Sequence, residues 1–458
     1  MSELAYKRTN VYEKADEKTL KAIFDYAEGY KAFLDEGKTE REACACVERM
    51  AKENGYTPFA FGQKLKAGDK VYYNNRGKNM YLIKVGTADV AKDGIRIIAS
   101  HIDSPRLDLK QVPLYETEGI AFAKTHYYGG VRKYQWATIP LALHGTVALA
   151  NGSVIDVKIG EDENDPVFYI SDLLPHLAAK QNVKPLGEAI GGEDLNIWLG
   201  NIPYTTASDD KDKTVKENLL KILNEKYGMV EADFLSAELS LVPAFKAKDI
   251  GFDRALIGAY GHDDRVCSYP AVTALFDETS NEHTIMVVLA DKEEIGSEGT
   301  TGMQCAIFTD LINEIAASFG ASSAAVRANS KCLSADVNAA YDPNYPEVTE
   351  KMNSTYVSHG AGVTKFTGAR GKSGSNDANA EFVGFLRKLF DENGVIWQTG
   401  ELGKVDVGGG GTVAKYIANM NIDTIDIGVA VVSMHAPYEV VSKADVYQNY
   451  LAFRAFIK

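Results

Sequence analysis

One short stretch, at residues 95–108, constrains this chain more than any other. The apolar run 95–99 predicts a buried strand. It leads directly into His101 and Asp103, and Pro105 then prevents the chain from continuing as an interior strand. Because ligands of open α/β sheets bind where strands end, we interpret His101 as a metal ligand that Asp103 orients. The alternative is a histidine and an aspartate at an ordinary strand exit.

The charge of the chain limits the binding partners that we expect, and its cysteines indicate its cellular compartment. The 458 residues carry 49 basic and 63 acidic side chains, a formal net charge of −14. Nucleic acids and anionic membranes attract clustered Lys and Arg, so we expect neither partner. The sequence has no apolar run of about eighteen residues and no apolar signal-peptide core at its N-terminus. Five cysteines, an odd number, fit a reducing cytoplasm better than a disulfide framework.

Two kinds of sequence pattern alternate along the chain and predict two domains. Residues 1–108 and 247–458 combine helical spacing of apolar groups with short apolar strands, which is typical of an α/β mixed sheet flanked by helices. Residues 109–246 instead contain strand pairs with turn signals, such as Asn151-Gly152. We therefore predict a discontinuous α/β domain that is interrupted by an inserted β-rich domain. One long apolar strand, at 422–432, is expected to lead to His435.

Predicted strands of the α/β domain end in potential metal ligands at five places. Each place alone is weak, because a pair of carboxylates is usually a solvated loop or turn and a lone histidine is usually structural. Together they supply two imidazoles and several carboxylates, which is the inventory for two divalent metal ions. The residues are His101, Asp263 with Asp264, Glu293 with Glu294, Asp336 and His435.

The residue types fit the chemistry of two neighbouring ions. Two cations a few ångströms apart repel each other, so an anionic carboxylate is needed between them. A general base beside a metal-activated water must not itself bind metal, because its lone pairs have to accept the proton. Adjacent Glu293 and Glu294 can divide these roles, since neighbouring side chains point in different directions.

These motifs resemble the aspartyl aminopeptidase family, which includes vacuolar aminopeptidase I. The resemblance runs over nearly the whole chain. It implies a zinc-exopeptidase-like catalytic domain with an inserted oligomerisation domain, acting as a two-metal aminopeptidase on peptides with a free N-terminus. The segments that carry the resemblance are Ala99–Asp108, Asp291–Ser297, Ser334–Asp336, Asp342–Tyr345, Ser433–His435, and Tyr128–Gly130 with Trp136 and Pro140.

The resemblance also implies a role for each residue of the site. Asp103 would hold His101 through its second ring nitrogen. Glu293 would take a proton from water and pass it to the leaving amine. A cis peptide bond would join Asp263 to Asp264. Zinc is the expected metal, with cobalt or manganese as alternatives. The expected ligands are His101 and Asp336 for one ion, Glu294 and His435 for the other, and Asp263 as the bridge.

Three residues are expected to face the substrate. His176 matches a histidine that the family sends into a neighbouring subunit's active site, which implies a homo-oligomer such as a tetrahedral dodecamer; the alternative is a histidine inside the inserted domain. The glycine run with Gly409 and Gly410 is interpreted as a backbone wall beside the substrate, with a tight turn into a helix as the alternative. Asn338 and Asp342 replace family histidines, so a preference for acidic N-terminal residues does not follow.

Other functions stay open at this point. A two-metal deacylase or carboxypeptidase of related fold would use the same ligands. A non-catalytic assembly scaffold would have no use for an unliganded Glu293. Nucleotide binding through the glycine run is disfavoured, because the run lacks both Gly-Lys-Ser/Thr and the spaced Gly-x-Gly-x-x-Gly pattern.

Overall fold

The computed structural model describes residues 4–205 and 213–458, and the chain divides into two compact units. The first unit holds the chain up to Asp103, Ala247–Met434 and Glu439–Lys458; the second holds Ser104–Lys246 and His435–Tyr438. The sequence prediction divided the chain after residue 108. The second unit starts earlier because strand β5 pairs entirely within that unit's own sheet. Residues 206–212 of the predicted insert lie outside the described residues.

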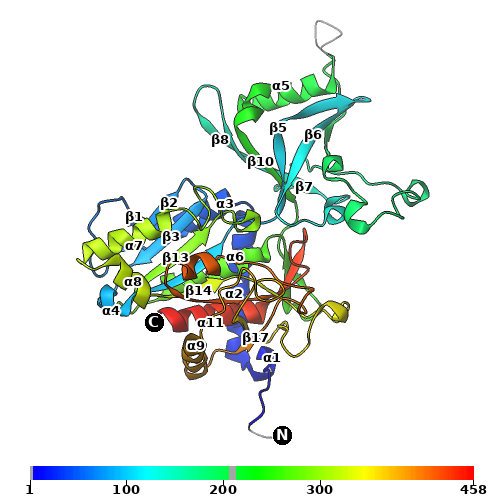
Figure 1. Cartoon of the computed structure of the whole chain (residues 1–458). Coiled ribbons are helices and arrows are strands. Elements are labelled where there is room, and N and C mark those ends of the chain that lie inside the picture. The colour runs from blue at the N-terminus through cyan, green and yellow to red at the C-terminus, as the bar shows by residue number, and fades with distance from the viewer. Residues whose placement is uncertain (1–3, 206–212) are drawn as a thin grey trace. The chain divides into compact units, whose positions relative to one another are not determined.

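A mixed nine-stranded sheet forms the centre of the first unit (Figure 1). The predicted strand at 95–99 is its β4, which runs on to His101 and is parallel to both of its neighbours, β13 and β14. In sheet order the strands are β1 (Thr57–Pro58), β2 (Lys70–Asn75), β3 (Asn79–Lys84), β13 (Thr284–Ala290), β4 (Ile95–His101), β14 (Lys331–Ala335), β18 (Asp423–Gly428), β16 (Ala361–Thr364) and β17 (Trp397–Thr399).

Helices cover both faces of this sheet. The strands present apolar side chains to both faces, so each face needs a covering layer. In β4, Ile98 packs with α2 and α11, whereas Ile97 and Ala99 pack with α7. The first face is covered by α2 (Glu17–Glu36), α3 (Glu40–Glu53), α6 (His262–Asp277), α9 (Ala380–Glu392) and α11 (Lys443–Ile457), and the second by α7 (Ile307–Ser318), α8 (Ser323–Asn329) and α10 (Ala414–Ala418); α1 (Val11–Lys14) and α4 (Val90–Asp93) are short.

A second, five-stranded sheet of the first unit corrects one expectation. The apolar run 422–432 was predicted to be a single strand, but it forms β18 of the large sheet and β19 of the small one. The break lies at Gly428 and Val429, where the backbone passes close to Asp336: a Cβ on Gly428 would lie 1.8 Å from the Asp336 carbonyl oxygen. The strands are β11 (Lys248–Ile250), β12 (Leu256–Ala259), β20 (Glu439–Ser442), β19 (Ala430–Val432) and β15 (Asn338–Ala339).

The second unit is built on an antiparallel six-stranded sheet. The predicted hairpin around Asn151-Gly152 is the β7–β8 pair of this sheet. No helix among the described residues of either unit is long and apolar enough to cross a bilayer. The strands, in sheet order, are β8 (Val154–Ile159), β7 (Leu141–Ala148), β10 (Ala237–Pro243), β5 (Arg106–Thr117), β6 (Ile120–Tyr128) and β9 (Ile197–Gly200), with helix α5 (Val215–Tyr227).

Candidate metal centre

Three neighbouring parallel strands of the first unit end together and carry most of the predicted site. His101 closes β4 and stands in register with Ala290, the last residue of β13. Glu293 follows shortly after the end of β13, and Asp336 follows directly after β14. Because parallel strands present their carboxyl ends at one edge of the sheet, this topology gathers side chains that are far apart in the sequence.

The structure brings six His, Asp and Glu side chains of this edge into overlapping groups. Within each group the potential ligand atoms lie within 4.8 Å of one another. Nε2 of His101 lies 3.1 Å from Oδ1 of Asp263. Zinc binds nitrogen and carboxylate oxygen at about 2.0–2.2 Å, so such a spacing suits two ligands of one ion. The groups are His101–Asp263–Glu294, His101–Glu293–Asp336 and Asp263–Asp264–Asp336.

Asp263 and Asp264 enter this cluster from the start of α6. Gly261 precedes them with φ 74°, and neither aspartate has helical torsion angles. The peptide bond between the two aspartates is cis, as the family resemblance implied. Asp264 was not among the predicted metal ligands, yet it belongs to one of the groups. An Asp-Asp pair in sequence is most often a turn, so only the three-dimensional arrangement distinguishes this one.

The carboxylates of the cluster are electrostatically strained in the chain alone. Burial raises the pKa of Asp336 well above its usual value, and the charge of Asp264 raises it further. Burial also raises the pKa of Asp264 well above normal. Burial lowers the pKa of His101, but hydrogen bonds to Asp103 and Asp263 outweigh it and hold that pKa well above normal. A buried cluster of this kind calls for a cation.

The side chains present fit a divalent metal as that cation. Oδ1 of Asp264 is buried and has no hydrogen-bond partner among the described residues. Arg265, the next residue, directs its guanidinium to the backbone oxygens of Gly261, Lys38 and Ile102 rather than to these acids. The imidazole and carboxylate donors of the cluster are those that zinc, cobalt and manganese accept.

Asp103 does more in the structure than the sequence suggested. Its backbone oxygen lies 3.0 Å from Nδ1 of His101, and its carboxylate oxygen Oδ1 lies 3.2 Å from the same nitrogen. The backbone N–H groups of Glu293 and Glu294 donate to the two oxygens of the same carboxylate, at 3.1 and 3.2 Å. One buried aspartate therefore contacts both the histidine and the paired glutamates.

His435, the fifth predicted ligand, belongs to the second unit. Its Nδ1 lies 3.0 Å from the backbone oxygen of Gly130, and a Cβ added to Gly130 would lie 3.0 Å from the same nitrogen. An Nδ1–H that donates to Gly130 leaves Nε2 as the nitrogen available to a metal. Sequence reasoning missed this contact, although Tyr128-Gly-Gly130 was part of the family resemblance.

The three predicted substrate residues are found in a short exposed helix and in a tightly packed glycine run. His176 is exposed in the short 3₁₀ helix Pro175–Leu177 of the second unit. Gly409 has φ 131°, and a Cβ there would lie 2.2 Å from the Gly368 carbonyl oxygen. The backbone oxygen of Gly410 accepts a hydrogen bond from Gly368. The glycine run therefore packs tightly on a neighbouring loop before α10 begins, and its role as a substrate wall stays a prediction.

The two positions where family histidines are replaced have local partners. Asn338 donates to the backbone oxygen of Gly362 at 3.2 Å and accepts from the Thr364 hydroxyl at 2.6 Å. Asp342 accepts the backbone N–H of Asn344 at 2.8 Å. His262, beside the cluster, is not a free ligand, since Tyr30 contacts its Nδ1 at 2.7 Å and the Ile257 oxygen lies 3.1 Å from its Nε2.

Comparisons with known proteins agree with this geometry. A family model described as aminopeptidase I zinc metalloprotease (M18) matches residues 33–457. A curated relative from Clostridium acetobutylicum, a probable M18 family aminopeptidase 1, is 47% identical over 456 residues, or 98% of this chain and 97% of the relative. The crystal structure of an M18-family aminopeptidase from Thermotoga maritima has a TM-score of 0.94 at 42% identity, covering 99% of this chain and 100% of that one.

A more distant structure shares the fold. The S. cerevisiae mApe1 dodecamer gives a TM-score of 0.77 at 23% identity, covering 94% of this chain and 96% of that one. The family model and the close relatives span both units of the chain. The chain therefore belongs to the M18 family of aminopeptidase I zinc metalloproteases, hydrolases that remove residues from the N-terminus of peptides.

Proposed function

We propose that the acidic edge of the first unit holds two divalent metal ions, with zinc as the native metal. The observation that carries this proposal is the cluster of buried carboxylates around His101, in which Asp264 and Asp336 form no ion pair with a lysine or arginine among the described residues. His101, Asp263 and Asp336 each belong to two of the ligand groups. Of the two carboxylates among them, Asp263 is in the group that holds Glu294, so it is the candidate for the shared ligand. His101 with Asp336, and Glu294 with His435, complete the proposed set.

Glu293 is the proposed general base. Bound divalent ions supply an acidified water molecule and polarise the carbonyl group of the first peptide bond. Glu293 accepts the proton from that water and delivers it to the leaving amine. Its backbone N–H donates to the Asp103 carboxylate at 3.1 Å, and this hydrogen bond fixes the backbone from which the Glu293 side chain extends. Asp103 thus acts as a positioning residue for His101 and Glu293.

The test is hydrolysis of a panel of aminoacyl-nitroanilides by metal-loaded protein. We expect Glu293→Gln to lose about 10²–10⁴ of the turnover of the unaltered protein while it keeps its metal content. Glu298→Gln, an exposed glutamate of the same loop, is the matched control and should retain activity. The panel also identifies the preferred N-terminal residue.

Two outcomes would overturn this assignment. Equal turnover by Glu293→Gln and the unaltered protein would remove Glu293 as the base. Cleavage of N-acetylated substrates, or of the C-terminal residue of blocked peptides, with unblocked nitroanilides left intact, would favour the deacylase or carboxypeptidase alternative. Absence of turnover with any substrate, at full metal content, would favour the scaffold.

The second unit is proposed to serve homo-oligomerisation in a cytoplasmic enzyme. His176 lies in an exposed segment with Leu173, Leu174 and Leu177, whose side chains are 52%, 51% and 67% accessible. Exposed apolar patches of this kind mark interaction sites, and a distant structural relative is a dodecamer. Light scattering of Leu174→Asp, which places a charge in the patch, should show a smaller assembly. An unchanged mass would argue against this segment. The five free cysteines support the proposed cytoplasmic location.

A further inference from the structure

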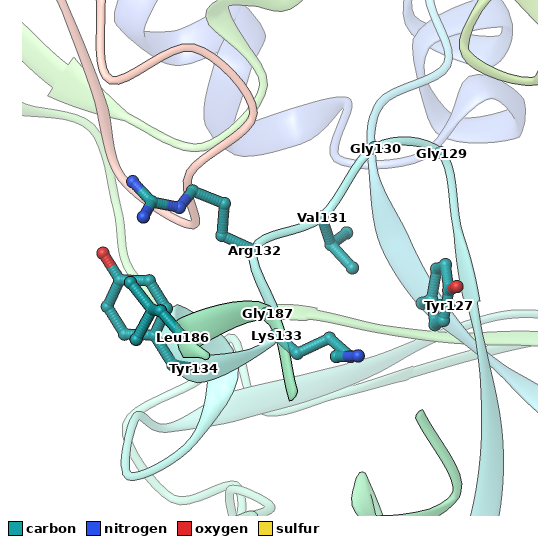
Figure 2. A pocket seen from close by; sticks show the side chains of 9 residues that line it. All are labelled: Tyr127, Gly129, Gly130, Val131, Arg132, Lys133, Tyr134, Leu186 and Gly187. Carbon is teal, nitrogen blue, oxygen red and sulfur yellow. The ribbon is translucent and has the colours of Figure 1, made fainter. Parts of the chain in front are cut away.

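The proposed chemistry leaves two features of the structure unused. The first is a pocket of about 240 Å³ in the second unit, beside the turn that follows β6, with Arg132, Lys133 and Gly187 in its lining (Figure 2). The Arg132 and Lys133 side chains extend in opposite directions in Figure 2, so they do not converge on one ligand. The second feature is Asp291, an aspartate of the first unit that lies two residues before Glu293 and is only 1% exposed. Its contacts bear directly on the placement of that glutamate.

Asp291 closes the loop of residues 291–302, which carries both Glu293 and Glu294. The backbone N–H of Asp291 donates to the Thr301 backbone oxygen at 3.3 Å. The Thr301 hydroxyl donates in return to Oδ2 of the Asp291 carboxylate at 2.5 Å. Both residues are buried, so water does not compete for this hydrogen bond. The two ends of the loop are therefore joined through one buried pair of residues.

The same carboxylate oxygen also binds the residue that directly precedes Glu293. Nζ of Lys292 lies 2.6 Å from Oδ2 of Asp291. Lys292 has φ 67°, in the left-handed region, where a lysine persists only when its surroundings hold it. The Lys292 backbone oxygen accepts the Ser297 N–H at 2.6 Å, which folds the intervening turn back on itself. The conformation at Lys292 thus sets the direction in which the chain enters Glu293.

The base of the loop is itself tied to the central sheet. Nδ2 of Asn79, at the start of β3, donates to the Thr301 backbone oxygen at 2.8 Å, and Asn79 is fully buried. Thr301 therefore contacts the sheet through its backbone and Asp291 through its hydroxyl. Asp103 accepts the backbone N–H groups of the paired glutamates. The paired glutamates are thus held by two aspartates, by Asp103 directly and by Asp291 through the base of the loop.

We propose that Asp291 is a positioning residue for the hydrolysis, because its carboxylate holds the loop in the shape that places Glu293 beside the reacting water. This inference rests on the proposed role of Glu293 as the general base. In this role Asp291 acts through the loop backbone, by way of Thr301 and Lys292, rather than on the substrate. A misplacement of about 1 Å in a catalytic group can cost about 10²-fold in rate. Loss of these contacts should therefore appear in kcat.

Thr301→Val and Thr301→Ser form the sharpest pair of variants. Valine has nearly the shape of threonine but cannot donate to Asp291, whereas serine keeps the hydroxyl group. At saturating metal we expect Thr301→Val to lower kcat for an aminoacyl-nitroanilide about tenfold, with KM unchanged. Thr301→Ser should keep most of the activity. Thr300→Val makes the same change at the exposed neighbouring threonine and is the control.

Asp291→Ala removes both contacts at once. We expect its kcat at saturating metal to fall by about 10²-fold. The double variant Asp291→Ala/Thr301→Val should be no worse than Asp291→Ala alone, because both changes break the same contact. Urea unfolding and metal content are measured on every variant. A residue that only stabilises the fold would lower the free energy of unfolding and leave kcat of the folded, metal-loaded enzyme unchanged. If Asp291→Ala does not fold, the Thr301 pair still tests the contact.

Either of two results contradicts the proposal. The first is a kcat of Thr301→Val equal to that of the Thr300→Val control. The second is an equal loss in Thr301→Val and Thr301→Ser, which would assign the effect to the shape of the side chain instead of its hydroxyl group. If the unaltered protein has no nitroanilide turnover, or if Glu293→Gln is as active as the unaltered protein, the proposed function fails instead. The two failures are therefore distinguishable.

Discussion

The two units of this protein place their charged side chains in opposite ways. In the first unit, Asp263, Asp264 and Asp336 form one group at the end of a sheet, and burial together with the charge of Asp264 raises the pKa of Asp336. In the second unit, the cations Arg132 and Lys133 line a pocket, and neither forms an ion pair with a carboxylate of residues 4–205 or 213–458. Repulsion within a buried cluster is tolerated only when a cation compensates it. An exposed cation needs no such partner. The difference distinguishes a buried acidic cluster that suits a metal ion from an exposed basic pocket.

The strongest test of this contrast removes the shared carboxylate. Asp263→Ala should lower metal affinity by more than the roughly 10–100-fold that outer partners of metal ligands contribute, and activity should fall with it. Metal content after dialysis and turnover of a nitroanilide measure both. Asp253→Ala, an exposed aspartate of the same unit, should keep its metal. Full metal content in Asp263→Ala would remove this residue from the site.

A second variant asks whether every buried acid of the first unit is a metal ligand. Asp426 lies under the glycine run, and its Oδ1 accepts the hydroxyls of Thr412 and Ser334 at 2.7 and 2.8 Å. Burial raises the pKa of Asp426 to about 6. In the unfolded chain it ionises near pH 3.9, so folding stability is lost as pH rises from about 4 to about 6, by about 3 kcal/mol in total.

Urea unfolding of the unaltered protein and of Asp426→Asn, across that pH range, measures this effect. The difference in stability between the two proteins should shift in favour of the variant as pH rises. Metal content should be the same in both. A pH-independent difference would show that burial does not raise the pKa of Asp426. Loss of metal in Asp426→Asn would show that this acid takes part in metal binding.

Asp103→Asn tests the positioning part of the metal centre. The amide oxygen can accept one of the two N–H groups of Glu293 and Glu294, but the amide nitrogen faces the other N–H without a bond. We expect metal affinity to fall by about 10–100-fold, with kcat reduced even at saturating metal. Competition with a chelator gives the affinity. An effect on kcat without any change in metal affinity would show that Asp103 positions the two glutamates but not the metal ligand His101.

The smallest expected effect probes the second unit. Gly130→Ala places a methyl group 3.0 Å from Nδ1 of His435 and should turn the ring away from its present position. We expect metal affinity to fall by only about threefold to tenfold, because one ligand is disturbed rather than removed. Gly187→Ala adds the same methyl group in open space and is the control. If Gly130→Ala binds metal as tightly as the control, the Gly130 contact does not contribute to metal binding.

Sequence patterns anticipated the edge of the sheet well, because each predicted ligand follows an apolar run. His101 at the end of β4 and Asp336 after β14 were placed in this way. Local patterns pointed to Asp264 as a potential ligand but did not place it in the ligand set, and they did not show the second set of contacts of Asp103, because both depend on segments that are distant in sequence. The run at 422–432 was wrong as one strand, since apolar composition does not record which sheet a residue joins.

The same limit applied in the second unit. The contact between Gly130 and His435 joins residues 305 positions apart in the chain. From the sequence, the glycine pair that ends at Gly130 can be interpreted as a turn. The sequence does not show that this turn contacts His435. The pocket around Lys133 was invisible for a related reason, because Gly187 reaches it from a different part of the unit.

Gly428 illustrates how the backbone itself limits substitution near the centre. A Cβ added to Gly428 would lie 1.8 Å from the Asp336 carbonyl oxygen, and the neighbouring Ile427 accepts a hydrogen bond from the Asp336 N–H at 3.1 Å. In a library of all single variants, position 428 should therefore admit no residue other than glycine, even alanine. Among family members, we expect glycine at the matching position wherever the main chain of the corresponding aspartate is held in the same way.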